Sequence, residues 1–132
     1  MKKNAIIIGG STGIGFNFAN KLSKLNYDLT IVSNNLKNLN KAKDKILKNE
    51  IRSKVKILKF DLTKEKEVSK LITNLSKEKT KFTFMVYCPG RAFYGETLKI
   101  PTNVKHDIIK LHIFSYTKIV NFFVSHMLKH GY

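Results

Sequence analysis

The sequence predicts an α/β fold in which a doubly wound parallel sheet is covered by helices on both faces. Short apolar runs rich in β-branched residues alternate with segments of helical periodicity four times along the chain. The first of these runs, residues 5–8, is apolar enough to be buried on both faces, which is typical of parallel sheets. Because crossovers between parallel strands are right-handed, we expect the strand order 3-2-1-4.

Length and composition narrow the class of protein. With 132 residues and neither an internal repeat nor a linker, residues 1–132 are expected to form a single domain. No apolar run approaches the ~20 residues that cross a bilayer, so we expect no membrane partner. Cys88 is the only cysteine, which excludes an intrachain disulfide and a thiolate metal cluster. We therefore expect no metal and a location in the reducing cytoplasm.

The formal charge of +16 raises the alternative of a basic nucleic-acid-binding domain. Lysine supplies nearly all of this charge, and the only arginines are Arg52 and Arg91. Arginine is the usual residue for reading bases and for bidentate contacts with phosphate. The lysines are also spread over every expected helix and form no single patch. We therefore rank nucleic-acid binding last among the functions considered.

A glycine-rich turn follows the first expected strand, residues 5–8. The glycines are Gly9, Gly10, Gly13 and Gly15. The first helix, about residues 13–25, then places four apolar residues on one side: Ile14, Phe18, Leu22 and Leu25. The start of a helix carries unpaired N–H groups and partial positive charge, and glycine lets a ligand approach the backbone. This turn is therefore predicted to bind an anionic group such as a phosphate.

The spacing Gly9-x-x-x-Gly13-x-Gly15 differs from the dinucleotide fingerprint Gly-x-Gly-x-x-Gly and lacks the lysine of a triphosphate loop. It resembles the cofactor loop of the short-chain dehydrogenase/reductase family, Thr-Gly-x-x-x-Gly-x-Gly, with Ile8 in place of the threonine. The resemblance implies a Rossmann-like, NAD(P)-binding fold. It also implies that these turn residues bind the dinucleotide: Gly9, Ser11, Thr12, Gly13, Ile14 and Gly15. The alternative is a plain turn without a ligand.

The second expected strand, residues 29–33, ends where a dinucleotide fold normally meets the adenosine ribose. The resemblance places Asn34 at a position where the family often has arginine. No carboxylate is present there to repel a 2′-phosphate, and Lys37 is close in sequence. We therefore favour NADP over NAD. The alternative is that Asn34 and Asn35 only make the turn into the next helix, residues 36–49.

The third expected strand, residues 55–60, is followed by Asp61-Leu62-Thr63. In the resembled family this triplet lies beside the adenine ring, which implies that Asp61 accepts a hydrogen bond from the exocyclic amine and that the Leu62 backbone approaches the base. The other interpretation is that Asp61 or Thr63 caps the following helix, residues 64–77, whose first turn is acidic. The two roles are compatible.

The fourth expected strand, residues 82–88, ends at Pro89-Gly90. The family has Asn-Asn-Ala-Gly here, lining the nicotinamide-ribose region, so the resemblance assigns a cofactor role only to Gly90. Cys88 is expected to be a buried small residue. In the long helix expected over residues 102–130, His112 takes the position of an asparagine in the family's proton relay. A structural role for His112 is the favoured alternative.

The resemblance implies an NAD(P)-dependent oxidoreductase that transfers hydride between a carbonyl and an alcohol. It covers only the N-terminal half of a family member, so the sheet is expected to stop after the fourth strand and its helix. The catalytic Tyr-x-x-x-Lys pair is missing, because none of the five tyrosines has a lysine four residues later. Alternatives are a non-catalytic dinucleotide-binding module or a gene fragment. A second chain supplying the missing half is a possible partner, and the fourth strand would be an open edge.

Overall fold

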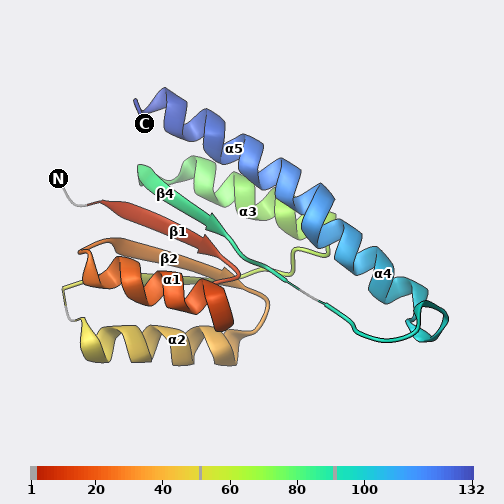
Figure 1. The fold of residues 1–132 in the computed structure, drawn as a ribbon. Helices are drawn as coiled ribbons and strands as arrows, with labels where there is room; N and C mark the ends of the chain where they lie inside the picture. Colours follow the sequence, from red (N-terminus) through yellow and green to blue (C-terminus); the bar gives the residue numbers. More distant parts are fainter. Residues whose placement is uncertain (1–2, 51, 91) are drawn as a thin grey trace.

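The computed structural model describes residues 3–50, 52–90 and 92–132, and within them a parallel four-stranded sheet carries helices on both faces (Figure 1). The strands are β1 (Asn4–Ile8), β2 (Asp28–Ser33), β3 (Val55–Lys59) and β4 (Phe82–Tyr87). The helices are α1 (Gly13–Lys24), α2 (Leu36–Asn49), α3 (Glu65–Lys77), α4 (Thr102–Ile109) and α5 (Tyr116–Lys129). The strand order is β3-β2-β1-β4, which confirms the predicted fold class and topology.

β1 lies in the middle of the sheet because it is apolar on both faces. Residues 5–8 are fully buried, and Ile7 lies between Ile31 of β2 and Val86 of β4. Ile6 and Ile8 belong to the core on one face, and Ala5 and Ile7 to the core on the other. β2 and β3 follow on one side of β1, and β4 lies on its other side, so the strand order reverses direction at β1. Ligands of open α/β sheets bind beyond the carboxyl ends of the strands at such a point, and the turn that follows β1 lies there.

Each face of the sheet has its own hydrophobic core. On one face α3 and α5 contribute Val68, Leu71, Leu75, Ile119 and Phe123. On the other face α1 and α2 contribute Ala19, Leu22, Leu39 and Ile46. The periodicity in residues 36–49 and 64–77 predicted most of these inward positions, since apolar residues three and four apart share one side of a helix.

The buried side of α1 differs from the predicted one. Three of the four residues expected to share the apolar side are exposed, by 71%, 45% and 58%: Ile14, Phe18 and Leu25. The residues that face the sheet are Gly15, Ala19 and Leu22. The small side chains of Gly15 and Ala19 let the helix approach the strands closely, and this close packing sets the rotation of the helix.

The long C-terminal helix is not α-helical throughout. α4 and α5 are joined by the π-helical segment η2 (Lys110–Ser115), so the long helix expected over residues 102–130 is present through Lys129 but is π-helical in its middle. The Tyr87 hydroxyl donates to the Leu111 carbonyl at 2.6 Å, and the Ser115 hydroxyl donates to the Leu62 carbonyl at 2.5 Å. The Leu111 carbonyl lies within the helix, and a side chain that binds a helix carbonyl competes with the i to i−4 hydrogen bonds and widens the turn. The Leu62 carbonyl lies between β3 and α3, so the Ser115 bond anchors the segment to that loop.

Candidate functional site

A cavity of about 570 Å³ lies where the carboxyl ends of the four strands meet the start of α1. All ten residues predicted to bind the cofactor line it: Gly9, Ser11, Thr12, Gly13, Ile14, Gly15, Asn34, Asp61, Leu62 and Gly90. They come from four segments that are far apart in the sequence. The parallel sheet brings them together because every strand ends at the same edge.

The glycine turn is packed between the end of β4 and the start of α1. Gly9 has φ +79°, and a Cβ there would lie 2.4 Å from the Pro89 nitrogen. A Cβ on Gly15 would lie 2.2 Å from the Gly9 carbonyl oxygen. Only hydrogen fits at either position, so glycine at 9 and 15 is what allows the first turn of α1 to lie against the end of β1.

The N-terminus of α1 opens into the cavity. Its N-cap residue, Thr12, is extended, and its side chain makes no capping hydrogen bond. Gly13 has φ +56°, and nothing lies within 4 Å of where its Cβ would be. The Phe16 amide bonds to the Thr12 carbonyl, which leaves the amides of residues 13–15 as the orphan donors of the first turn. With no acidic residue in that turn, these amides form a cradle for an anion.

Amide and hydroxyl side chains line the cavity at the end of β2. The Ser11 hydroxyl donates to the Ser33 hydroxyl at 2.8 Å and so ties the glycine turn to β2. Asn34 lines the cavity beside Asn35, whose side-chain oxygen accepts from the Asn38 amide at 2.9 Å and caps α2. The turn interpretation therefore holds for Asn35. Lys37, which is close to Asn34 in sequence, is exposed and outside the described lining.

At the end of β3, Asp61 is held by its neighbours. Its Oδ1 accepts from the Thr63 amide at 3.1 Å and from the Thr63 hydroxyl at 2.7 Å, and its Oδ2 lies 3.5 Å from the Lys64 Nζ. Burial acts to raise the pKa of Asp61, but the Thr63 hydrogen bonds and the Lys64 charge outweigh it and lower the pKa below 3.8. Asp61 is therefore a carboxylate at neutral pH and can accept a hydrogen bond from a ligand.

The predicted capping role of Asp61 or Thr63 is wrong in detail. The N-cap of α3 is Lys64, and it makes no side-chain capping bond. Instead, Glu67 in the first turn of α3 accepts from the Asp61 amide at 2.6 Å through its Oε2. The acidic first turn thus fixes the strand end, and Asp61 is tied to Thr63 in a local turn.

A second hollow of about 420 Å³ adjoins the cavity at the end of β4. It shares four lining residues with the cavity: Ile14, Cys88, Pro89 and Gly90. His112 lines only this second hollow, together with Tyr87 and Tyr116. Burial raises the pKa of Tyr87 to about 12, and its hydroxyl is already bonded to Leu111.

Cys88, expected to be buried, is half-buried where the cavity and the second hollow meet. Burial raises the pKa of its thiol, so the protonated form dominates at neutral pH. A protonated thiol is a poor nucleophile, which agrees with the passive role expected for Cys88.

Sequence reasoning missed several lining residues, among them Ser33, Asn38, Phe60 and Leu111. Ser33 and Phe60 stand at or directly after a strand end, and this position is a usable signal. Asn38 follows the Asn35 cap by three residues, which places it at the first turn of α2. Leu111 lies in η2, far along the chain from the strand ends that form the cavity, and no local sequence pattern indicates that it lines the cavity.

Across residues 3–50, 52–90 and 92–132, no three His, Cys, Asp or Glu side chains gather closely enough to hold a metal ion. Over the same ranges, every helix is too short or too polar to span a bilayer.

The strand order and the glycine turn that opens α1 define a Rossmann-like α/β domain. Residues 3–132 match the family model described as short chain dehydrogenase, and the chain therefore belongs to that family. A comparison with curated protein sequences gave no match.

Solved structures share the fold at low sequence identity. The chain is similar to L-sorbose reductase from Gluconobacter frateurii, complexed with NADPH and L-sorbose (17% identity, TM-score 0.85, 98% of this chain and 49% of that chain). It is similar to a short-chain dehydrogenase from Sphingobium yanoikuyae in complex with NADPH (19% identity, TM-score 0.87, 98% of this chain and 50% of that chain). A third similar structure is the bulky-bulky ketone specific alcohol dehydrogenase from Comamonas testosteroni (18% identity, TM-score 0.87, 98% of this chain and 51% of that chain). The chain spans about half the length of these proteins.

Proposed function

We propose that residues 1–132 form a partial Rossmann-type domain that binds a nicotinamide dinucleotide, as the N-terminal portion of an oxidoreductase acting on carbonyls or alcohols. The observation that carries the proposal is the uncapped start of α1, which opens into a cavity lined by all ten predicted residues. Membership of the short chain dehydrogenase family supports the class of reaction.

Each part of the cavity has a role in this proposal. The amides of residues 13–15 bind the pyrophosphate, because they are orphan donors at a positively polarised helix end. Asn34 binds the adenosine ribose, and Asp61 and the Leu62 backbone hold the adenine. Gly90 lies on the nicotinamide side. The bound cofactor would supply the hydride.

NADP is preferred over NAD in this proposal. Asn34, Asn35 and Asn38 line the end of β2 and bring amides and no carboxylate, so a 2′-phosphate meets no opposing charge there. The net charge of +16 attracts the more anionic dinucleotide. Structures of family relatives that contain NADPH point the same way.

The chemical step needs groups that residues 1–132 do not contain. The sequence has no Tyr-x-x-x-Lys pair, and His112 lies in the second hollow, outside the cavity. A second chain that brings the missing half would supply them, in the reducing cytoplasm. The isolated chain is accordingly expected to bind cofactor without turning over ketones.

Cofactor binding can be tested by thermal unfolding with NADPH and with ADP-ribose. A ligand at a hundredfold excess over its Kd stabilises the folded state by about 2.7 kcal/mol, which raises Tm by several degrees. Gly13→Val should abolish the rise, because a side chain at Gly13 would occupy the cradle. Gly131→Val is the matched control, since Gly131 also has positive φ and open space but lies outside the cavity. An unchanged Tm at millimolar ligand contradicts the proposal.

A non-catalytic dinucleotide-binding module is the second candidate. Two observations favour a module without catalysis. The Tyr87 hydroxyl is already bonded to the Leu111 carbonyl, and the Cys88 thiol is protonated, so neither side chain is suited to act as an acid or base beside the cavity. Incubating the chain with NADPH and a panel of ketones, with and without added cell extract, separates the two. Turnover with extract that exceeds the rate of the extract alone favours the oxidoreductase half, and turnover by the chain alone that is lost in His112→Ala contradicts both.

A further inference from the structure

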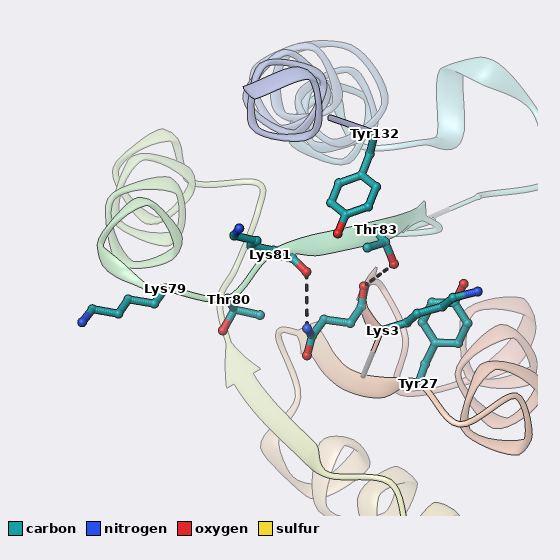
Figure 2. Close-up of a pocket in the computed structure, with 8 residues that line it drawn as sticks. Lys3, Tyr27, Lys79, Thr80, Lys81, Thr83 and Tyr132 are labelled. Atoms are coloured by element: carbon teal, nitrogen blue, oxygen red, sulfur yellow. Dashed lines mark hydrogen bonds between the residues drawn. The ribbon is translucent and has the colours of Figure 1, made fainter. Parts of the chain in front are cut away.

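A hollow of about 750 Å³ lies where β1 and β4 begin, and we call it the amino-end hollow (Figure 2). Its lining comes from the start of β1, the turn after α1, the residues that lead into β4 and the end of α5. Among the described residues, none lines both this hollow and the cavity at the carboxyl ends of the strands. Its volume falls within the range of about 300–1,000 Å³ that is usual for small-molecule sites.

Tyr27 is fixed at one side of the amino-end hollow by the end of α1. Asn26 has φ +61°, and its amide donates to the Ser23 carbonyl at 2.9 Å. The Tyr27 amide donates to the Leu22 carbonyl at 3.1 Å, which completes a Schellman motif. The Tyr27 ring packs edge-on against Phe84 of β4, with the ring centres 6.2 Å apart. Tyr27 is therefore a fixed aromatic wall of the hollow.

Tyr132 is fixed at another side of the hollow by the same motif, at the end of α5. Gly131 has φ +79°, and its amide donates to the Leu128 carbonyl at 3.2 Å. The Tyr132 amide donates to the Met127 carbonyl at 3.0 Å. The side chain of Tyr132 extends towards β4, and 48% of the residue is exposed (Figure 2). Its ring therefore presents an aromatic surface on which a planar ligand can stack.

The charge of the hollow comes from three lysines: Lys3, Lys79 and Lys81. Its described lining contains no Asp or Glu. The acidic residues next to the lining in sequence are bonded to groups outside the hollow, because Asp28 accepts from the Lys54 amide at 2.7 Å and Glu78 pairs with Lys56 of β3. The hollow therefore has positive charge without a carboxylate to neutralise it, which suits an anion.

A β-bulge shapes the floor of the hollow. The register between β1 and β4 shifts between Asn4 and Ala5, so Thr83 is an extra residue in β4. The Thr83 hydroxyl donates to the Asn4 carbonyl, and the Asn4 Nδ2 donates to the Lys81 carbonyl, both at 3.3 Å (Figure 2). Bulges are frequent beside binding sites because they redirect a side chain. Here the bulge and its hydrogen bonds fix the backbone from which the Lys81 side chain enters the hollow.

We propose that the amino-end hollow binds a nucleotide, with its phosphates at Lys79 and Lys81 and its base stacked on Tyr132. Proteins hold nucleotides by this combination of cationic side chains for the phosphates and an aromatic ring for the base. An inorganic anion would use the lysines but leave the aromatic walls and most of the volume unused. The site lies at the opposite end of the sheet from the proposed dinucleotide cavity, and the inference does not depend on the proposed function.

Uridine triphosphate (UTP) is a suitable probe, because it lacks the adenine that the dinucleotide cavity is proposed to bind. Inorganic tripolyphosphate is the matched control, since it carries a similar charge and no base. Isothermal titration calorimetry should show at least about tenfold tighter binding of UTP, because only UTP can stack on Tyr132. Equal affinity for the two ligands shows attraction to the lysines alone and overturns the inference, as does the absence of UTP binding.

Tyr132→Leu tests the stacking contact. It should weaken UTP binding about tenfold, whereas Tyr132→Phe should retain it, because a phenylalanine ring still stacks. The backbone bonds that end α5 are unaffected by either change. Tyr94→Leu removes a tyrosine that is 96% exposed and outside the hollow, and it should leave UTP binding unchanged. Binding that is indifferent to Tyr132→Leu overturns the inference.

Paired changes of charge test the phosphate contacts. Lys79→Glu with Lys81→Glu should weaken UTP binding at least about tenfold. Lys41→Glu with Lys48→Glu changes the net charge equally on exposed residues of α2 and should weaken binding far less. Equal weakening by the two pairs shows that UTP responds only to the overall charge of the chain, and this result overturns the inference.

Two further titrations identify the site and the source of the nucleotide. Gly13→Val, which blocks the start of α1, should leave UTP binding unchanged; loss of binding in this variant places UTP in the dinucleotide cavity and overturns the inference. Hexauridylate compared with UTP distinguishes the sources. Similar affinity identifies a free nucleotide as the ligand, and binding at least about tenfold tighter identifies single-stranded RNA.

Discussion

The Cβ that Gly15 lacks would stand 2.2 Å from the carbonyl oxygen of Gly9. This contact joins the first turn of α1 to the end of β1 through backbone atoms alone. The distance is far below any real carbon–oxygen contact, and neither backbone can move without disturbing the central strand. The shape of the cavity therefore depends on the absence of a side chain at Gly9 and at Gly15.

Gly15→Ala should destabilise the fold. Overpacking of a closely packed site typically costs about 1–3 kcal/mol, and here the methyl group meets backbone atoms. Urea unfolding followed by circular dichroism measures the loss. Gly90→Ala is the control, because its Cβ would meet nothing nearer than 4.0 Å; its effect should stay within about 0.5 kcal/mol. Equal effects of the two variants would contradict the packing described for Gly15.

Tyr87→Phe tests the origin of the π-helical segment. It removes the 2.6 Å hydrogen bond to the Leu111 carbonyl, which should cost about 1 kcal/mol. With the carbonyl released, the segment should shorten towards α-helical geometry, and amide hydrogen exchange over residues 112–117 should change. Tyr94→Phe removes a hydroxyl from a residue that is 96% exposed and should change neither quantity. Unchanged exchange in Tyr87→Phe would show that the π turn has another cause.

His126 should make the fold less stable in mild acid. Its Nε2 accepts from the Phe82 amide at 3.3 Å. Burial and the neighbouring charges of His130 and Lys129 lower its pKa below 6.5. The folded state thus binds the proton more weakly than the unfolded state, so this contribution is complete above pH 6.5 and is lost as pH falls through the folded pKa.

The urea midpoint measured from pH 7.5 to 5 tests this dependence. His126→Gln keeps an acceptor without a titrating group, so its midpoint should fall less over that range than that of the unmodified chain. His106→Gln removes an exposed histidine on α4 and should leave the dependence unchanged. A fall of equal size in His126→Gln would assign the pH dependence to another group.

Asn34→Asp should change the choice of cofactor. A carboxylate at the end of β2 repels a 2′-phosphate and accepts from a ribose 2′-hydroxyl. The ratio of NADPH affinity to NADH affinity should fall about tenfold or more, as measured by thermal unfolding over a range of ligand concentrations. Asn49→Asp changes the charge equally at the exposed end of α2 and should leave the ratio unchanged.

Strand order and the position of the cavity could be predicted because both follow from local patterns. Residues 5–8 are apolar at every position, and residues 29–33 are apolar at three of five, and such runs are typical of strands buried on both faces. Asn34, Asp61 and Gly90 stand one to three residues after strand ends, so a parallel topology alone brings them together. Their roles towards a dinucleotide stay predictions.

The rotation of α1 about its axis could not be predicted from periodicity. Periodicity identifies the face with large apolar side chains, but the face that packs on the sheet here is the one with the smallest side chains. Ile14 and Phe18 look like core residues in sequence, yet Gly15 and Ala19 occupy the core. The π turn was missed for a similar reason, since the hydroxyl that takes the Leu111 carbonyl comes from β4. Contacts of this kind appear only once the chain is folded.

The pairing of the first and fourth strands has a consequence for the newly synthesised chain. Asn4 donates through its Nδ2 to the Lys81 carbonyl, 77 positions later, and Gly9 is closed in by Pro89. The glycine turn at residues 9–15 emerges from the ribosome about 75 residues before the segment that packs behind it. The nascent chain therefore cannot complete the cavity behind the glycine turn until the segment around residue 89 has been synthesised and has reached the sheet.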